Sequence, residues 1–439
     1  MFTFHQLVSL LGIPVLIFIT WLFSNNKKAF PWRVVIWGTI LQFAFALFVL
    51  KTSIGFEIFD YLARFVTATL DFTNRGADFV FGSLGDWAKG TGQLGFFAFR
   101  VLPTIIFISS LMSVLYYLNI MQHVVSGMAK FMKFFMGVSG AEALSCAANV
   151  FVGQTEAPLV IRPYISKMTM SELLVVMVGG MATVAGGVLA AYVGMGVDAK
   201  HLITASVLSA PAALVIAKII FPEDGTPLTS GEVKVHVPVT DVNIIDAAAN
   251  GAASGLKLAL NVGAMLIAFI ALIALVNAGL GFLGDILGIN SLLTSLNVPE
   301  ALLVPVQQGG QTVFEPQLTL ELISGYLMAP FAWLMGTPWH DCVEVGALLG
   351  QKIITNEFIA YDQFVKMTKA GLLDARSQII VTYALCGFAN FSSIAIQIGG
   401  IGGIAPDRKH DLAKLGIKAL IGGTLAAYMT ANIAGILVA

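Results

Sequence analysis

Long apolar segments constrain this chain more than any other feature of its sequence. Eight of them are about 20 residues long or longer, the length that an α-helix needs to cross the hydrocarbon core of a bilayer. They are residues 6–23, 33–51, 96–118, 173–196, 202–221, 258–283, 379–404 and 414–438. The sequence therefore predicts an all-α polytopic membrane protein with eight transmembrane helices.

The composition supports this class and excludes others. Only 11% of the residues are charged, whereas soluble domains carry about 25%. The 24 basic and 25 acidic residues leave no net positive field, which excludes a nucleic-acid-binding protein. The three cysteines, Cys146, Cys342 and Cys386, lie far apart and predict neither a disulfide framework nor a metal cluster.

Basic residues gather in alternate loops between the predicted spans. They are Lys27, Lys28 and Arg33; Lys130, Lys133, Arg162 and Lys167; and Arg408, Lys409 and Lys414. No Lys or Arg lies between Lys257 and Lys352, where several acidic residues are found. By the positive-inside rule, we expect the basic loops in the cytoplasm and both termini outside it. Segment 6–23 lacks a basic leader and continues directly into a second span, so it is interpreted as a retained helix.

Two further segments are too interrupted to be single spans. Residues 141–165 are broken by the sequence GQTEAP at 153–158, and residues 320–365 by Gly336-Thr337-Pro338 and by Asn356-Glu357. Irregular backbone at membrane depth is tolerated only where it is buried in protein or lines a wet cavity. The pattern therefore predicts two re-entrant hairpins.

Each predicted hairpin precedes a Gly-rich span and then one more span. Because the single span 258–283 separates the two copies, the second copy enters from the opposite face, as in the inverted repeats of transporters. The predicted domains are 1–95 (two spans and an interfacial segment), 96–122 (scaffold span three), 123–221 (first repeat), 222–257 (cytoplasmic loop), 258–290 (scaffold span six) and 291–439 (second repeat).

Polar residues inside these apolar segments are the candidate site. Glu156 and Glu357 are costly at membrane depth and normally face a cavity or a partner; the alternative places them at loop tips in headgroup water. Asn390 and Ser393 interrupt an apolar span, although small polar residues also join helices in membranes. Carboxylates and amides together suit a neutral, hydroxyl-rich ligand.

A second group of residues predicts a cation site. Asn149 and Thr183, with backbone carbonyls near Val152 and Val184, could supply oxygen ligands to a small hard cation, as unwound helices do for sodium. Hydrogen bonding between helices is the alternative interpretation of the same residues. The histidines form no zinc-protease motif, and no P-loop is present, so transport would be driven by an ion gradient.

Three longer motifs resemble the concentrative nucleoside transporters. They are ANVFVGQTEAPL at 148–159, GQKIITNEFIAY at 350–361, and GFANFSS at 387–393 with the glycines that follow it. The resemblance extends from about residue 101 to the C-terminus, and the short N-terminus is similar to that of bacterial members. It implies a homotrimer in the inner membrane whose mobile domain carries substrate across the bilayer, in the manner of an elevator.

The resemblance also implies residue roles. The nucleobase would meet Gln154, Thr155, Glu156 and Val188, while Glu357, Asn390 and Ser393 would hold the ribose and Phe388 would line the pocket. Asn149, Val152, Thr183 and Val184 match the sodium positions, with Thr183 standing where the family often has Ser. The implied function is sodium-driven import of nucleosides, with no cofactor.

Other functions remain open at this stage. Coupling to protons and transport of free nucleobases are the alternatives within the transporter class. A membrane enzyme using Glu156 and Glu357 as an acid/base pair is a remote one, because no nucleophile or metal constellation accompanies them. A channel is disfavoured, because two hairpins around a closed pocket suggest alternating access.

Overall fold

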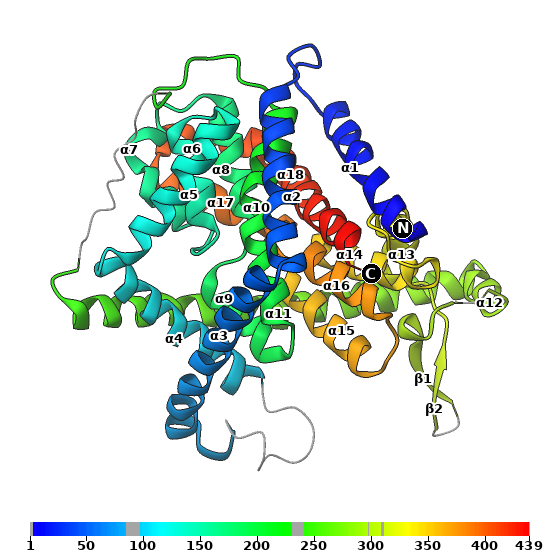
Figure 1. Ribbon diagram of the computed structural model, residues 1–439. Coiled ribbons are helices and arrows are strands. Elements are labelled where there is room, and N and C mark those ends of the chain that lie inside the picture. The colour runs from blue at the N-terminus through cyan, green and yellow to red at the C-terminus, as the bar shows by residue number, and fades with distance from the viewer. Residues whose placement is uncertain (1–2, 85–96, 231–240, 297, 309–310, 439) are drawn as a thin grey trace.

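The computed structural model describes residues 3–84, 97–230, 241–296, 298–308 and 311–438. Helices make up nearly all of its regular structure (Figure 1). The strands within these residues are β1 (Val304–Gln308) and β2 (Gln311–Glu315), which pair antiparallel. The predicted helical membrane class is confirmed, whereas this small hairpin was not predicted.

The N-terminal part contains two predicted spans and one long amphipathic helix. Helices α1 (Phe4–Leu22) and α2 (Trp32–Lys51) coincide with the predicted spans 6–23 and 33–51. Helix α3 (Ser53–Phe81) follows directly, since Thr52 caps it by accepting a hydrogen bond from the Gly55 N–H. Its charged residues, such as the Asp60–Arg64 ion pair, keep it from being a span.

The first half of the core is built from short helices. Helix α4 (Phe97–Tyr117) bends by 79° into α5 (Ile120–Met136). The segments that follow are α6 (Gly140–Asn149), η2 (Ala157–Ile161), α7 (Arg162–Ile165), α8 (Met170–Ala182), α9 (Gly186–Met195) and α10 (Ala199–Ile220). Segment 141–165 thus turns back on itself between α6 and η2, as predicted for the first hairpin.

A single helix, α11 (Ile244–Ile286), joins the two halves. It contains the predicted span 258–283 but begins inside the segment 222–257 that was predicted to be a loop. Asn243 caps it by accepting a hydrogen bond from the Asp246 N–H, and the Ala- and Gly-rich sequence that follows continues the helix to the apolar span. Most side chains of α11 outside its contact with α4 are exposed.

The second half repeats the order of the first. Its elements are α12 (Ile289–Thr294), η3 (Glu300–Leu302), β1, β2, α13 (Leu320–Leu334), η4 (Trp339–Asp341), α14 (Cys342–Ile354), α15 (Glu357–Lys369), α16 (Ala375–Leu385), α17 (Phe391–Ile404), η5 (Pro406–Arg408) and α18 (Lys409–Leu437). Helices α14 and α15 form the second hairpin, with Thr355 and Asn356 at its turn. The sequence Gly336-Thr337-Pro338, which was predicted to interrupt the second hairpin, lies before it and separates α13 from α14.

Two segments predicted as continuous spans are broken. The predicted span 173–196 is interrupted at residues 183–185, between α8 and α9, and the span 379–404 at residues 386–390, between α16 and α17. By length and composition, six of the described helices can cross a membrane, or seven if the bent α4–α5 pair is one span. The count of eight therefore stays a prediction.

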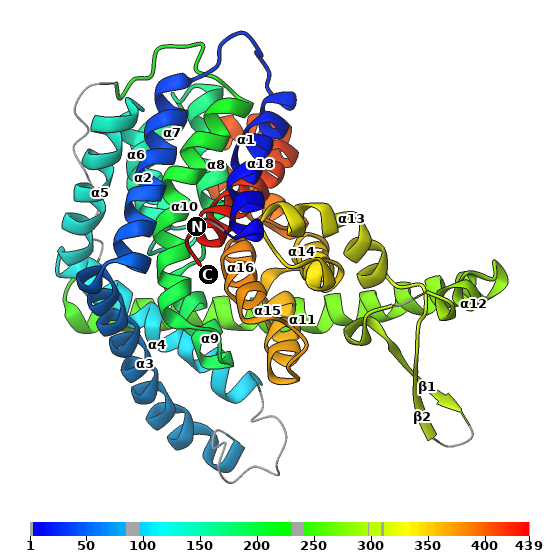
Figure 2. The ribbon, with the colours of Figure 1, turned by 45° about the vertical axis from the view of Figure 1, so that its right-hand side comes forward.

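The two halves enter the core from opposite ends. The loop between α1 and α2 and the loop after α10 lie at one end, where the Asn25 N–H donates to the Ile220 carbonyl at 2.9 Å. At the other end, Arg376 of α16 donates to the Gly336 carbonyl at 2.8 Å and also to that of Val438, near both chain termini. Helices α8, α10 and α18 pack on one another in the core (Figure 2). Most of α8 and α10 is buried, as are residues 422–437 of α18.

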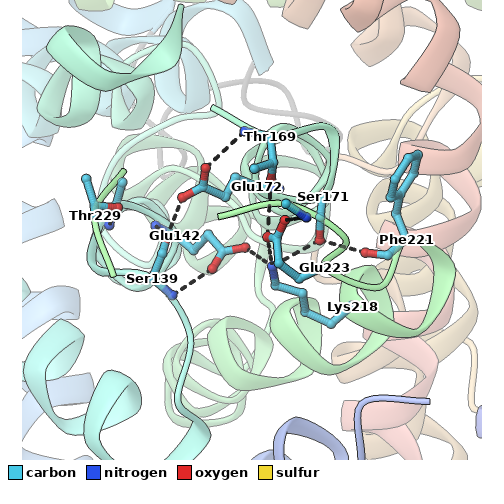
Figure 3. Close-up of polar contacts among 11 residues, drawn as sticks. Ser139, Glu142, Thr169, Ser171, Glu172, Lys218, Phe221, Glu223 and Thr229 are labelled. Carbon is cyan, nitrogen blue, oxygen red and sulfur yellow. Dashed lines mark hydrogen bonds and ion pairs between the residues drawn. The ribbon is translucent and has the colours of Figure 1, made fainter. Parts of the chain in front are cut away.

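A buried charged cluster anchors the base of the first hairpin (Figure 3). Lys218 of α10 forms ion pairs with Glu142 of α6 and, at 2.9 Å, with Glu223. Ser139 donates its hydroxyl to Glu172 at the start of α8, at 2.6 Å. The cluster therefore fixes α6, α8 and α10 to one another, at the end of the molecule that also carries the basic loops.

A smaller cluster occupies the corresponding place in the second half. The Asp374 N–H, at the start of α16, donates to Asp341 at the base of the second hairpin at 2.9 Å. His340 lies 3.1 Å from Asp374, so one His and two Asp side chains gather there. In each half, the base of the hairpin is thus bound to the start of the next helix.

Candidate functional site

The two helix breaks meet in the middle of the molecule. The Phe388 N–H, in the second break, donates to the Thr183 carbonyl, in the first, at 3.2 Å. Gly387 has φ +142°, and a Cβ atom there would lie 2.8 Å from the Met181 carbonyl oxygen. Only glycine allows both this conformation and this approach. The Gly-rich sequence therefore joins the two halves at their breaks.

The second break holds the buried carboxylate of Glu357. Glu357 begins α15, at the turn of the second hairpin, and is only 3% exposed. Its Oε2 accepts a hydrogen bond from Asn390 Nδ2, and its Oε1 accepts one from the Tyr192 hydroxyl, both at 3.0 Å. Three elements, α9, α15 and the second break, thus converge on this carboxylate.

Asn390 also shapes the start of α17. Its Oδ1 accepts hydrogen bonds from the Ser393 N–H at 2.9 Å and from the Ser392 hydroxyl at 2.7 Å. It is therefore the N-cap of α17, and its amide nitrogen remains directed at Glu357. The sequence predicted Asn390 and Glu357 as site residues but not this direct contact.

The first hairpin contributes the amide of Gln154. Its Nε2 donates to the Ser393 hydroxyl at 3.1 Å, and its Oε1 accepts from Gln397 Nε2 at 3.0 Å. Gln397, in α17, also donates to the Met177 carbonyl of α8 at 2.9 Å. A Cβ at Gly180 would lie 2.8 Å from the Gln154 Cβ, so glycine lets the hairpin tip approach α8. Three buried segments, the first hairpin, α8 and α17, therefore meet at Gln154.

The remaining predicted residues of the first hairpin lie farther out. Thr155 is half-buried, close to Gly400 of α17. Glu156 is exposed, and its carboxylate turns back over Gly153. Glu156 makes no described hydrogen bond to Glu357, unlike Asn390 and Tyr192. The structure thus brings Gln154, Glu357, Asn390 and Ser393 together, while a role for Glu156 in the site stays a prediction.

Two predicted residues supply apolar surface near these groups. Val188 is 1% exposed in α9, one turn before Tyr192, and Phe388 is half-buried in the second break. An aromatic ring next to buried amides can pack on a planar ligand. Both residues stay predictions as parts of a ligand pocket.

The predicted cation ligands gather at the first break. Asn149, the last residue of α6, is fully buried, and its Oδ1 has no hydrogen-bond partner. Asn149 Nδ2 lies close to Gly179 of α8, 3.4 Å from the position that a Cβ atom would take there. The Thr183 hydroxyl donates a hydrogen bond to the carbonyl of the same Gly179, at 2.8 Å. Val184 is fully buried and Val152 half-buried nearby in the chain. A buried, unpartnered amide oxygen is available to a small hard cation, and a cation site formed by these four residues stays a prediction.

Sequence reasoning missed three buried polar residues around this site. Tyr192 holds Glu357, Gln397 holds Gln154, and Lys352 donates to the Ala384 carbonyl at 3.0 Å. Gln397 and Lys352 are polar residues within apolar segments, a signal that was available in the sequence. Tyr192 gave no such signal, because tyrosine is common in apolar helices.

Three family descriptions match most of the chain. The description "Na+ dependent nucleoside transporter N-terminus" matches residues 11–84, "Nucleoside recognition" matches residues 98–199, and "Na+ dependent nucleoside transporter C-terminus" matches residues 201–435. The chain belongs to the concentrative nucleoside transporter family. The resemblance found in the three motifs is therefore confirmed.

Individual relatives cover the whole chain. An uncharacterized transporter of Haemophilus influenzae is 44% identical over 436 residues, which are 98% of each protein. Sodium/nucleoside cotransporter 1 of Mus musculus is 41% identical over 99% of this chain, which spans 64% of that protein. The family consists of sodium-dependent transporters and not enzymes, so an acid/base pair is not the explanation of the two glutamates.

Solved structures show the same fold in several states. CNTnw in an inward-facing, substrate-bound state is 42% identical, with a TM-score of 0.87 over 99% of this chain and 98% of that one. A CNTnw variant in an outward-facing state gives a TM-score of 0.86 with the same coverage. The fold is thus that of a membrane transporter, and sodium is the coupling ion of its family.

Proposed function

We propose that this protein is a sodium-coupled symporter that imports nucleosides across the inner membrane of a bacterium. The observation that carries the proposal is a buried cluster fed by both hairpins: Glu357 bonds to Asn390 in the second break, and Gln154 bonds to Ser393 in the first turn of α17, directly after it. A buried set of carboxylate, amide and hydroxyl groups suits a neutral ligand with several hydroxyls. The full-length bacterial relatives support the assignment to a bacterium.

Ribose binds at the Glu357 side of the cluster. A sugar hydroxyl donates to the Glu357 carboxylate and accepts from Asn390, while Ser393 binds a neighbouring hydroxyl. In the structure these groups bond to one another, so a nucleoside exchanges these hydrogen bonds for its own. Deoxynucleosides bind more weakly, because the missing hydroxyl leaves a buried partner unsatisfied.

The base binds at the first hairpin. Gln154 offers both a donor and an acceptor, with Thr155 beside it, and Val188 and Phe388 pack on the ring. Glu156 takes part once its carboxylate turns away from Gly153. An amide can bind either purines or pyrimidines, so the two base classes are compared in the test below.

Sodium binds at the first break. Asn149 Oδ1 and the Thr183 hydroxyl oxygen are side-chain ligands, and the backbone carbonyls of Val152, Thr183 and Val184 complete the shell. The ion lies against α8, whose Met177 carbonyl binds Gln397 and through it Gln154. Sodium binding thus stabilises the arrangement of the first hairpin that meets the nucleoside.

Transport moves the repeats against a scaffold. Helices α4 and α11 pack on each other, and the outer face of α11 is exposed, which fits a scaffold that meets two further subunits in a homotrimer. The repeats, 123–221 and 291–439, carry the site across the bilayer as an elevator, consistent with the inward- and outward-facing states of CNTnw. Both termini face away from the cytoplasm, opposite the basic loops.

Uptake into proteoliposomes tests this function. Labelled uridine and adenosine are offered to vesicles with an inward sodium gradient, an inward proton gradient, or none. We expect accumulation only with sodium, inhibition by unlabelled uridine but not by uracil or ribose, and no uptake by Glu357→Ala reconstituted in equal amount. Accumulation driven by the proton gradient would show that protons are the coupling ion. Inhibition of uptake by uracil alone would show that the protein transports nucleobases.

A further inference from the structure

Gln397 is a buried amide that is not among the proposed ligand-binding residues but bonds directly to one of them. It lies in α17, has no exposed surface, and comes one turn after Ser393, so the two side chains share a face of the helix. Gln397 Nε2 donates to Gln154 Oε1 at 3.0 Å, and Gln154 Nε2 donates to the Ser393 hydroxyl at 3.1 Å. Successive turns of α17 thus hold the two ends of the Gln154 amide.

A backbone carbonyl fixes the orientation of the Gln397 amide. Gln397 Nε2 also donates to the Met177 carbonyl of α8, at 2.9 Å. A carbonyl oxygen only accepts hydrogen bonds, so the nitrogen end of the Gln397 amide must face it. The other end, Gln397 Oε1, is buried and has no hydrogen-bond partner among the described residues. The Met177 carbonyl is therefore the group that determines which way this amide lies.

The orientation of Gln397 fixes that of Gln154 in turn. Because Gln397 presents a nitrogen donor, the atom of Gln154 that meets it must be the acceptor Oε1, which leaves Nε2 at the other end. Ser393 does not determine this choice, because a hydroxyl can either donate or accept. The donor and acceptor ends of Gln154 are thus assigned by a chain of contacts that begins at the Met177 carbonyl.

The chain of contacts is closely packed and shielded from water. A Cβ atom on Gly180 of α8 would lie 2.8 Å from Gln397 Nε2 and 2.8 Å from the Gln154 Cβ, so glycine lets both amides lie against this helix. Gln154 is only 7% exposed. A reversed Gln154 amide would set its donor against the donor of Gln397 in a place where water cannot replace the lost hydrogen bond, which is costly.

A fixed amide distinguishes nucleobases by the order of the groups on their edges. Uracil and hypoxanthine carry a carbonyl acceptor next to a ring N–H donor, whereas cytosine and adenine carry an amino donor next to a ring-nitrogen acceptor. An amide can form two hydrogen bonds with either kind of edge, but it needs opposite orientations to do so. In a buried site, the base with the wrong order leaves polar groups unpaired and is rejected.

We propose that Gln397 sets the base specificity of this transporter by holding the Gln154 amide in one orientation. Gln397 is a positioning residue that acts through Gln154 without touching the nucleoside. The inference rests on the proposed nucleoside function and deepens it. It requires the same choice for small and large bases: a protein that favours uridine over cytidine also favours inosine over adenosine, and one that favours cytidine also favours adenosine.

The first test measures the affinities of the wild-type protein for these four nucleosides by calorimetry in detergent with sodium present. We expect the two members of each pair to differ in Kd by about tenfold or more, the scale of leaving a buried polar group unpaired, and in the same sense. Equal affinities within each pair, or opposite choices in the two pairs, would overturn the proposal. This measurement needs no variant, so it is decisive even if a substitution prevents folding.

The second test repeats these measurements with Gln397→Met. Methionine keeps the length of the side chain but donates no hydrogen bond, so the Gln154 amide is free to turn over and both affinity ratios should fall toward one. Gln42→Met is the matched control, since Gln42 is equally buried but lies in α2 and donates to the Gly38 carbonyl. This control should keep the wild-type ratios. Wild-type ratios in Gln397→Met would overturn the proposal.

A double variant tests whether Gln397 acts through Gln154. In a Gln154→Leu background, adding Gln397→Met should change the affinity ratios no further, because the amide that Gln397 positions is already absent. A further change would show that Gln397 meets the base itself and would contradict a positioning role. Failure of the wild type to bind any of the four nucleosides would overturn the proposed function together with this inference, whereas nucleoside binding with ratios that ignore Gln397 would overturn this inference alone.

Discussion

Tyr192→Phe isolates the contribution of one hydrogen bond to the substrate site. The change keeps the ring, which packs 4.4 Å from Tyr361 between centroids, and removes only the hydroxyl that donates to Glu357 at 3.0 Å. A hydrogen bond to a charged group contributes about 1.5–3 kcal/mol, which corresponds to about 10- to 150-fold in Kd. Since Asn390 still holds the other oxygen, we expect the lower end, about tenfold weaker uridine binding.

The chain offers a matched control for this prediction. Tyr361→Phe removes a hydroxyl from the same aromatic cluster, but that hydroxyl donates to the Thr382 carbonyl and not to Glu357. Both variants are assayed by calorimetry with uridine and with 3′-deoxyuridine. Tyr192→Phe should reduce the preference for uridine over 3′-deoxyuridine, and Tyr361→Phe should leave it unchanged. An equal loss of preference in both variants, or in neither, would refute the assignment of Tyr192 as the residue that orients Glu357.

Three further predictions test other parts of the structure. Gly387→Ala should cost about 1–3 kcal/mol or more in strain at φ +142° and lower the melting temperature, with the Cβ pressed against Met181; Gly399→Ala, in open space, is the control. Lys218→Met should destabilise the protein by about 3–5 kcal/mol, because Glu142 is left buried without its partner, and Glu142→Gln should recover part of this loss in thermal unfolding. Thr183→Val should raise the half-saturating sodium concentration for uptake about tenfold, the loss of one ligand oxygen, while Thr204→Val, a buried Thr bonded to Lys200 instead, should not. An unchanged melting temperature of Gly387→Ala would contradict the first account. Equal melting temperatures of Lys218→Met and the double variant would contradict the second, and unchanged sodium activation of Thr183→Val would contradict the third.

Much of the architecture could be predicted because membrane spans are determined by local composition. The apolar segments gave α1, α2, α4 and α10 nearly to the residue, and polar interruptions located both hairpins. Polar residues at membrane depth also predicted Glu357 and Asn390 as site residues, because an uncompensated polar group is costly there, whereas Gln154 was predicted from the family resemblance.

Features that depend on partners far along the chain were harder to predict. The breaks at 183–185 and 386–390 lie within segments whose overall hydropathy predicts continuous spans, and the two halves bind each other there. The contact between Tyr192 and Glu357 joins residues 165 positions apart. The orientation of Glu156, turned over Gly153, depends on the shape of the hairpin tip, which residue spacing does not specify.

The β-hairpin and the early start of α11 were not predicted, although the local sequence favours both. The predictions relied on hydropathy instead. The β-hairpin has the β-branched residues Val304, Val306 and Val313 on either side of Gly309-Gly310, a dipeptide typical of two-residue hairpin turns. Helix α11 begins at Ile244 because its Asn243 cap and Ala-rich start favour a helix before the apolar span begins. In both cases backbone propensity determined the structure outside the apolar segments.

A structure determined with uridine and sodium tests the central claim most directly. The account predicts ribose hydroxyls within hydrogen-bond distance of Glu357 and Asn390, the base beside Gln154, and an ion at Asn149 and Thr183. Uridine bound away from this cluster, with Glu357 still held by Tyr192 and Asn390 alone, would contradict it.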